Sequence, residues 1–171
     1  MKTSCYSTAL RCLTIMVATV AFTAGLFALQ GGESRAQEAV KTASATAIKW
    51  YSYQDSLKIG KQEGKKIFLN FYADWCTYCV KMEKETFRDP EVVAYLNKYF
   101  VSARVNSDRQ QDLARKYNVQ GLPSTWFLAA DGEAIGNLPG YIPAKMMLKI
   151  LGFVGTDSYK TMTFQQYLKK M

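Results

Sequence analysis

Short apolar runs alternate with amphipathic stretches over most of the chain, and the two patterns predict different elements. Runs of apolar and aromatic residues bounded by polar or turn-forming residues are typical of buried strands. The last run follows the turn signal Asp131-Gly132, which predicts an antiparallel return strand. The sequence predicts strands over residues 66–72, 101–107, 124–130 and 133–138.

Segments with apolar residues at helical spacing lie before, between and after these strands. Asp55 and Gly64 are placed to begin and end the first helix, and Pro90 fits the first turn of another. Thr163 and Gln166 have the spacing of a capping box, which predicts a short terminal helix. The predicted helices cover about residues 53–64, 76–88, 90–100, 109–119, 144–154 and 163–171.

The order of these elements indicates the fold class. A strand–helix–strand half is followed by a hairpin and a helix, which is typical of an α/β fold with a mixed central sheet flanked by helices. The first two strands are joined by helical segments, so we expect them to lie parallel through a right-handed crossover. The length of 171 residues suggests one domain with extensions.

Residues 1–36 have the pattern of a targeting segment. Lys2 and Arg11 form a basic start, and residues 13–29 are uncharged and mostly apolar. Small residues stand where a signal peptidase cleaves, so we expect a signal peptide that ends at Ala36. The apolar stretch is also only slightly shorter than a membrane span of roughly 20 residues, so an uncleaved anchor is the alternative.

The remainder of the chain divides into a linker and a domain. Residues 37–49 are small and polar without a firm period, which is typical of a linker. Residues 50–171 then have the composition of a globular domain. Residues 1–36 hold three of the 22 basic and one of the 14 acidic residues, so the exported part carries a formal charge of +6.

The charge and the residue types exclude several classes of function. Lysine and arginine are scattered rather than gathered in a stripe or block, so we expect no nucleic-acid partner. The chain has no histidine, which excludes histidine acid–base catalysis and most zinc sites. We expect no metal site, and we expect the domain to be a monomer.

The cysteine count narrows the candidate chemistry. Cys5 and Cys12 lie in the predicted signal peptide, so the exported domain keeps Cys76 and Cys79. A domain with only one close cysteine pair is not a disulfide scaffold. A bridge across so short a loop also restricts the unfolded chain little, so a purely structural disulfide is a weak explanation of the pair. A structural zinc needs about four ligands, and the exported domain offers no others. Capture of Cu(I) by the two thiolates remains an alternative.

The position of the pair favours thiol–disulfide exchange. Cys76 lies where a predicted strand gives way to a helix, and the free N–H groups and dipole of a helix N-terminus favour a thiolate. Cys79 follows about one turn later on the same face. Cys76 is therefore placed to attack a partner's disulfide, and Cys79 is placed to resolve the mixed disulfide. We expect Cys76 to be the more exposed of the two.

The sequence context resembles the thioredoxin superfamily. The run "FYADWCTYC" after a buried strand, and a Gly-Leu-Pro before a later strand, carry the resemblance over about residues 53–154. Within that superfamily the chain looks most like the exported reductant branch, which includes the C-terminal domain of DsbD-type thiol:disulfide interchange proteins. The residues that match this branch are Tyr72, Ala73, Asp74, Trp75, Cys76, Cys79, Glu83, Thr86 and Phe87.

The resemblance implies roles for residues around the pair. It implies a thioredoxin fold in which Pro123 is a cis-proline facing the cysteines, and in which the Leu122 backbone pairs with an extended substrate strand. Trp75 is expected to cover the edge of the active site. Tyr78, in the dipeptide between the cysteines, is expected to contact the substrate together with Leu122 and Pro123.

The sequence departs from the thioredoxin pattern at one supporting position. Asn70 stands where thioredoxins usually carry a buried aspartate that accepts a proton from the second cysteine, and an amide does not take up a proton at neutral pH. Glu83 lies one helical turn after Cys79 and matches a glutamate of the exported branch. We therefore hypothesise that Glu83 helps to deprotonate Cys79. The alternative is a surface glutamate that pairs with a nearby lysine.

These observations predict an exported, periplasmic disulfide reductase. A membrane electron donor of the interchange type would reduce the pair, and disulfide-containing envelope proteins would oxidise it. The resemblance implies no cofactor beyond the redox-active disulfide. The alternatives are a disulfide oxidase or isomerase, and a Cu(I)-binding or chaperone module that uses the same two thiols.

Overall fold

The computed structural model describes residues 47–171 of the chain. The predicted signal peptide or anchor, residues 1–36, and most of the predicted linker lie outside the described residues. No helix within residues 47–171 combines the length and the apolar character that crossing a bilayer requires. The elements are β1 (Trp50–Tyr51), α3 (Tyr53–Glu63), β2 (Lys66–Tyr72), α4 (Thr77–Glu85), α5 (Pro90–Tyr99), β3 (Phe100–Asn106), α6 (Gln111–Lys116), β4 (Ser124–Leu128), β5 (Ala134–Pro139), α7 (Ala144–Gly155), the 3₁₀ turn η2 (Ser158–Lys160) and α8 (Phe164–Lys170).

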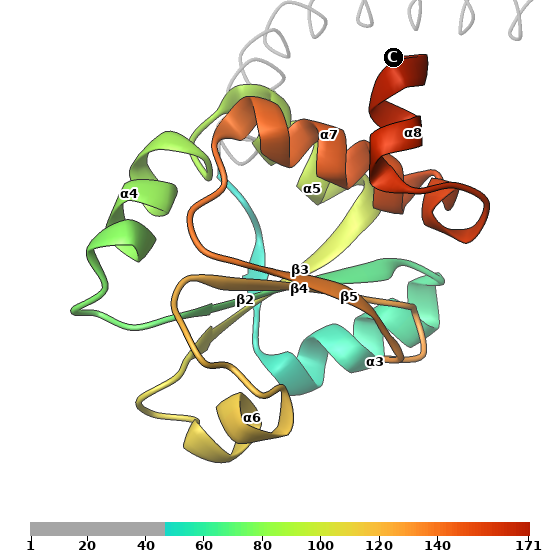
Figure 1. The fold of residues 1–171 in the computed structure, drawn as a ribbon. Helices are drawn as coiled ribbons and strands as arrows, with labels where there is room; N and C mark the ends of the chain where they lie inside the picture. Colours follow the sequence, from blue (N-terminus) through green and yellow to red (C-terminus); the bar gives the residue numbers. More distant parts are fainter. Residues whose placement is uncertain (1–46) are drawn as a thin grey trace, which may run out of the picture. The chain divides into compact units, whose positions relative to one another are not determined.

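A five-stranded mixed sheet forms the centre of the fold, in the order β1-β3-β2-β4-β5. β1, β3 and β2 run parallel, whereas β4 is antiparallel to both β2 and β5. Helices cover both faces, with α5 and α7 on one side and α3 and α6 on the other (Figure 1). This arrangement confirms the predicted thioredoxin fold, including the parallel pair and the hairpin.

The central strand β2 contributes side chains to both layers of the core, because its side chains alternate between the two faces of the sheet. Phe68 belongs to the cluster on the side of α5 and α7, whereas Leu69 and Phe71 belong to the cluster on the side of α3 and α6. All three side chains are fully buried. A strand that is buried on both faces explains why residues 66–72 read as a nearly continuous apolar run.

Several local features differ from the sequence prediction, and α6 in particular covers only Gln111–Lys116 of the predicted 109–119. The N-cap of α3 is Ser52 rather than Asp55, because the Ser52 side chain accepts a hydrogen bond from the Asp55 N–H. The helix that begins at the cysteines ends at Glu85 rather than near Arg88, because the N–H groups of Thr86 and Phe87 both bond to the Met82 carbonyl and close the last turn. β1 was not predicted, because its two residues are too short for a periodic pattern.

The last residues of the predicted linker are packed against the domain. The Lys49 N–H donates to the Asn97 side chain at 3.0 Å, and that side chain donates to the Ala47 carbonyl at 2.8 Å. Ile48 between them is buried in the core. The packed part of the chain therefore includes residues 47–49.

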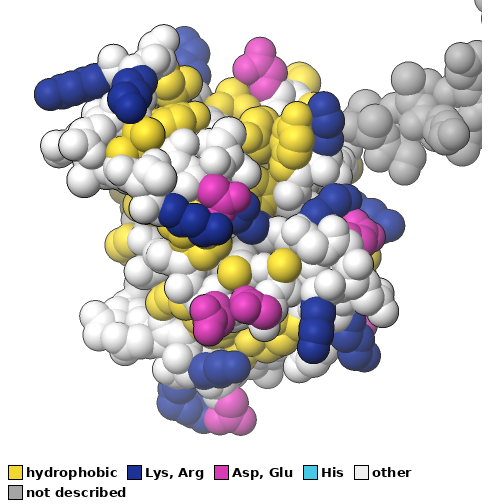
Figure 2. Space-filling view, turned by 90° about the vertical axis from the view of Figure 1, so that its right-hand side faces the viewer, with side chains coloured by type: hydrophobic (Ala, Val, Ile, Leu, Met, Phe, Trp, Pro, Cys, Tyr) yellow, Lys and Arg dark blue, Asp and Glu magenta, His cyan; other side chains and the backbone are white. Residues whose placement is uncertain are grey.

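Charged side chains of both signs are mixed on the face shown in Figure 2, which is the right-hand side of Figure 1. Lysine and arginine are interspersed there with acidic and hydrophobic side chains rather than gathered in one patch. This matches the scattered distribution along the sequence. The expected absence of a nucleic-acid partner concerns the whole surface and stays a prediction.

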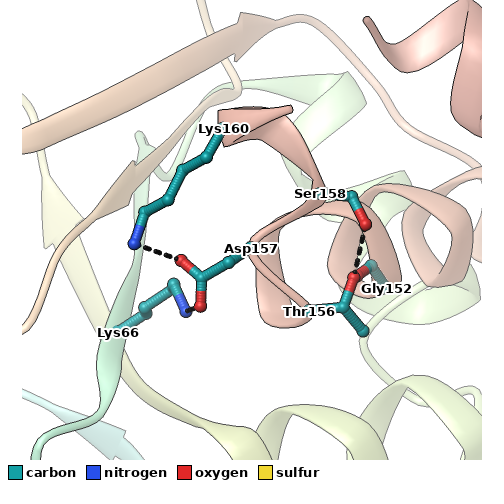
Figure 3. A network of polar contacts seen from close by, with 6 residues as sticks. All are labelled: Lys66, Gly152, Thr156, Asp157, Ser158 and Lys160. Atoms are coloured by element: carbon teal, nitrogen blue, oxygen red, sulfur yellow. Dashed lines mark hydrogen bonds and ion pairs between the residues drawn. The ribbon is translucent and has the colours of Figure 1, made fainter. Parts of the chain in front are cut away.

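An ion-pair network holds the segment after α7 to the start of β2. Asp157 accepts from Lys66 at 2.9 Å and pairs with Lys160 at 2.9 Å (Figure 3). The hydrogen bonds and charges of Lys160 and Lys66 lower the pKa of Asp157 from 3.8 to about 2. Asp157 also has a positive φ of 60°, a conformation that asparagine and aspartate tolerate better than most residues.

We expect Asp157→Asn to lower the free energy of unfolding by less than about 1 kcal/mol at neutral pH, because solvent screens the half-exposed carboxylate. Asparagine tolerates a positive φ as aspartate does. The difference in the free energy of unfolding between the two proteins therefore measures the effect of the Asp157 charge. A lowered pKa stabilises the fold above the unfolded pKa of 3.8 and loses this effect as the pH falls toward 2. Urea unfolding at neutral pH and near pH 2 checks this, and an equal difference at both would contradict it.

Candidate active site

The two cysteines lie at the junction of β2 and α4. β2 ends at Tyr72, and Cys76 is the N-cap of α4 with an extended backbone. The Cys76 sulfur accepts a hydrogen bond from the Cys79 N–H at 3.1 Å. Cys76 and Cys79 form a disulfide with a Cα–Cα distance of 5.2 Å. A backbone N–H of the first helical turn, which is shared with the Cys76 carbonyl, therefore points at the Cys76 sulfur.

The disulfide is buried, but exposed aromatic side chains flank it. Cys76 is 5% exposed and Cys79 is 3% exposed. Cys76 was expected to be the more exposed of the two, but the difference in exposure is small. Trp75 and Tyr78 are 71% and 62% exposed. Large exposed apolar side chains next to a reactive group are typical of protein-docking surfaces. A contact between either aromatic residue and a substrate stays a prediction.

The loop before Cys76 is tied to the loop after β3. The Trp75 indole N–H donates to Asp108 at 2.9 Å, and Arg109 pairs with Asp74 at 3.3 Å. These contacts join positions that lie more than thirty residues apart in the sequence. They hold the exposed indole beside the disulfide, and the sequence analysis did not identify Asp108 or Arg109.

Leu122 approaches the pair from the segment before β4, and the expected position of Pro123 facing the cysteines stays a prediction. The Leu122–Pro123 peptide bond is cis, as the resemblance to thioredoxins implies. Leu122 and Tyr72 pack against the small buried cluster of Ala73 and the two cysteines. The Pro123 carbonyl accepts from the Gly140 N–H at 2.7 Å. The expected pairing of the Leu122 backbone with a substrate strand stays a prediction.

Asn70 lies in β2 beneath α4, where its side chain is buried. It is register-paired with Arg104 of β3 on one side and with Thr125 of β4 on the other. Its amide donates to the Thr125 hydroxyl at 3.4 Å. The position thus carries a neutral, hydrogen-bonded side chain in the layer that supports the active site.

Glu83 of α4 pairs with a strand residue that the sequence analysis did not identify. Its carboxylate lies 2.5 Å from the Arg104 guanidinium. The partner is therefore an arginine of the central sheet rather than a nearby lysine of the surface. An arginine inside the otherwise apolar and small-residue run of β3 was the signal that could have revealed it, because a charge in a buried strand needs a partner.

The C-terminal end of α4 is fixed to the segment before α7. The Thr86 hydroxyl donates to the Ile142 carbonyl at 2.6 Å, and the Tyr141 hydroxyl donates to Glu85 at 2.5 Å. The bond to Glu85 raises the pKa of Tyr141 above its usual value. Both ends of α4 are thus anchored, which fixes the orientation of the helix that carries the cysteines.

The fold, the redox pair and the cis-proline define a thioredoxin-like thiol:disulfide oxidoreductase. Residues 53–155 match the thioredoxin-like domain family, and this match covers more than half of the chain. The chain therefore belongs to that family. A thioredoxin from Thermus thermophilus is 33% identical with a TM-score of 0.59, and the match covers 63% of this chain and 87% of that chain.

Relatives with a similar sequence are named as thiol:disulfide interchange proteins DsbD. The protein from Vibrio vulnificus is 39% identical over 101 residues, which are 56% of this chain and 17% of that relative. The protein from Photorhabdus laumondii is 43% identical over 74 residues, which are 42% of this chain and 13% of that relative. The matched region is thus a small part of each of these relatives.

Proposed function

We propose that this protein is an exported disulfide reductase whose Cys76–Cys79 pair delivers electrons to oxidised cysteines of envelope proteins. The observation that carries the proposal is the position of Cys76, whose sulfur caps α4 and accepts the Cys79 N–H. A helix N-terminus stabilises a thiolate, which is the attacking form of a thiol. The resemblance to the exported reductant branch supports the direction of electron flow.

The reaction uses the two sulfurs in sequence. The Cys76 thiolate attacks one sulfur of the partner's disulfide, so a Cys76–partner bond forms, the partner's S–S bond breaks, and the leaving sulfur takes up a proton. The Cys79 thiolate then attacks Cys76, which restores the Cys76–Cys79 disulfide and releases the second partner sulfur as a thiol. The partner gains two electrons and two protons, and this protein ends in the disulfide state that the structure describes.

A dithiol donor must reduce the pair before the next cycle. We propose a membrane donor of the interchange type, because the DsbD relatives carry a similar domain within a much longer chain. The disulfide is the only redox group that this scheme needs, and the protein acts as a monomer. The periplasm is the proposed location, reached through a cleaved signal peptide or kept at the membrane by residues 13–29.

The redox state of the pair in living cells tests this proposal. Cells that express the full chain are quenched with acid, and free thiols are alkylated with a reagent that adds mass. We expect the pair to be mostly reduced and to be found in the periplasmic fraction. A chain that retains its N-terminal segment is heavier by the labels on Cys5 and Cys12, so the same gel reports cleavage.

Each competing function gives a different result in this experiment. A pair that is mostly oxidised in cells, and that becomes reduced when an oxidant of the envelope is removed, would assign the protein to the oxidases. A pair that never forms a disulfide but binds Cu(I) in the reduced state would assign it to metal capture. Either outcome contradicts the proposed reductase.

A further inference from the structure

Residues 140–142, between β5 and α7, link two parts of the candidate active site. On one side, the Gly140 N–H donates to the Pro123 carbonyl at 2.7 Å, which ties this segment to the residue of the cis peptide bond. On the other side, the Tyr141 hydroxyl and the Ile142 carbonyl both bond to side chains at the C-terminal end of α4. Three consecutive residues therefore connect the cis-proline to the helix that carries the cysteines.

Tyr141 contacts two residues on one face of α4. Lys81 and Glu85 are four residues apart in this helix, so their side chains are neighbours. The Tyr141 hydroxyl donates to Glu85 at 2.5 Å, and Nζ of Lys81 lies 4.8 Å from the centre of the Tyr141 ring. The bond to Glu85 raises the pKa of Tyr141, so the hydroxyl remains a donor at neutral pH. The ring is therefore held to the helix through both its hydroxyl and its face.

The neighbouring contact of the same segment is buried. The Thr86 side chain is fully buried and donates to the Ile142 carbonyl at 2.6 Å, and Ile142 itself is only 6% exposed. This bond holds the backbone of the segment whether or not Tyr141 carries a hydroxyl. The bond between Tyr141 and Glu85 is exposed, and water can replace either partner, so its loss should cost little stability. Its contribution is to the orientation of α4.

We propose that Tyr141 is a positioning residue that keeps α4 and the cis-proline segment at the spacing that an extended partner segment needs. This inference rests on the proposed reductase function, in which the partner pairs with the Leu122 backbone and presents its disulfide to Cys76. Leu122 packs against the cluster that contains both cysteines, so the two contacts lie close together. A shift of α4 relative to this segment would prevent the partner from making both contacts at once.

Loss of the Tyr141 hydroxyl should therefore weaken the docking of a protein disulfide without altering the thiols. Tyr141→Phe keeps the ring beside Lys81 and removes only the bond to Glu85. With insulin as the substrate, we expect KM to rise roughly threefold to tenfold, the range of one net hydrogen bond, while kcat changes by less than about twofold. Hydroxyethyl disulfide has no peptide backbone to dock, so its rate of reaction with the reduced protein should be unchanged.

Substitutions of Glu85 in the full-length protein test whether the hydrogen bond itself carries the effect. Glu85→Gln keeps an oxygen that can accept from the Tyr141 hydroxyl, so KM for insulin should stay close to that of the original protein. Glu85→Ala removes the acceptor and should raise KM as much as Tyr141→Phe does. The variant that combines Tyr141→Phe with Glu85→Ala should be no weaker than either single variant, because the two side chains act through one contact.

Tyr99→Phe is the matched control. The Tyr99 ring also lies beside a lysine, with Nζ of Lys98 4.9 Å from its centre. Tyr99 directly precedes β3, whereas the cysteines follow the end of the parallel strand β2, so Tyr99 lies at the opposite end of these strands. Tyr99→Phe should leave KM for insulin unchanged. Urea unfolding and the alkylation rate of Cys76 are measured for every variant, and the alkylation rate should match that of the original protein.

The outcomes distinguish this inference from the proposed function. An unchanged KM in Tyr141→Phe would overturn the inference, and so would an equal loss with hydroxyethyl disulfide, because Tyr141 would then act on the cysteine chemistry. A loss in Glu85→Gln as large as that in Glu85→Ala would contradict it too, since the charge would matter rather than the hydrogen bond. In these cases the original protein still reduces insulin, and the proposed function stands. If the original protein reduces neither substrate, the proposed function itself fails.

Discussion

Cys76→Ser is expected to abolish disulfide reduction while the fold is retained. The thiolate is the nucleophile of the exchange, and a serine hydroxyl at its ordinary pKa does not attack a disulfide. Cys76 is also the N-cap of α4, and serine is among the preferred N-cap residues. The substituted hydroxyl can accept the same hydrogen bond from the Cys79 N–H, so helix α4 should still begin at residue 77.

Reduction of insulin disulfides with a thiol donor measures this effect, and we expect the rate to fall to the uncatalysed background. Cys79→Ser is the informative companion, because it should still attack once and then accumulate as a mixed disulfide with its partner. Cys5→Ser and Cys12→Ser, outside the described residues, are the matched cysteine controls and should keep full activity. Activity that persists in Cys76→Ser would show that Cys76 is not the nucleophile.

Phe68→Ala is expected to destabilise the fold by about 3–5 kcal/mol, the usual cost of removing a fully buried phenylalanine. The Phe68 side chain has no exposed surface and lies at the centre of an aromatic cluster. Its ring centre is 6.1 Å from that of Trp50, 5.9 Å from that of Phe87 and 5.7 Å from that of Phe127. The cavity would thus open between the sheet and the segment that joins α4 to α5.

Urea unfolding followed by tryptophan fluorescence measures this loss as a lower midpoint with an unchanged slope. Phe68→Leu is the graded control, because leucine fills most of the same volume and should cost markedly less. Because the free energy of unfolding of a domain is only about 5–15 kcal/mol, Phe68→Ala is expected to remove a large part of it. A loss below about 1 kcal/mol would show that the aromatic cluster is not the centre of the core.

The elements with the strongest local patterns were predicted most accurately. β2 occupies residues 66–72 as predicted, because a strand buried on both faces reads as an apolar run between polar residues. The hairpin of β4 and β5 follows from the Asp131-Gly132 turn. β1 was missed because its two residues, Trp50 and Tyr51, become a strand only by pairing with β3, which is a tertiary effect.

The candidate site divides in the same way. The sequence context pointed to Cys76 and Cys79 as a redox pair and to Pro123 as a cis-proline, and the structure has the disulfide and the cis bond. The roles of these residues in disulfide exchange stay predictions. Arg104 was not identified as the partner of Glu83, because this contact depends on the pairing of β3 with β2 and on the packing of α4. Asp108 was missed for the same reason, since its bond to Trp75 spans 33 residues of sequence.

The reduction potential of the Cys76–Cys79 pair tests the central claim most directly. The purified full chain is equilibrated with glutathione buffers of known poise, and the fractions of dithiol and disulfide are counted after alkylation. The proposed reductase predicts a value near that of thioredoxin, about −270 mV, which suits transfer of electrons to envelope proteins. A value near that of the strong periplasmic oxidant, about −120 mV, would contradict the account and make the protein a disulfide donor.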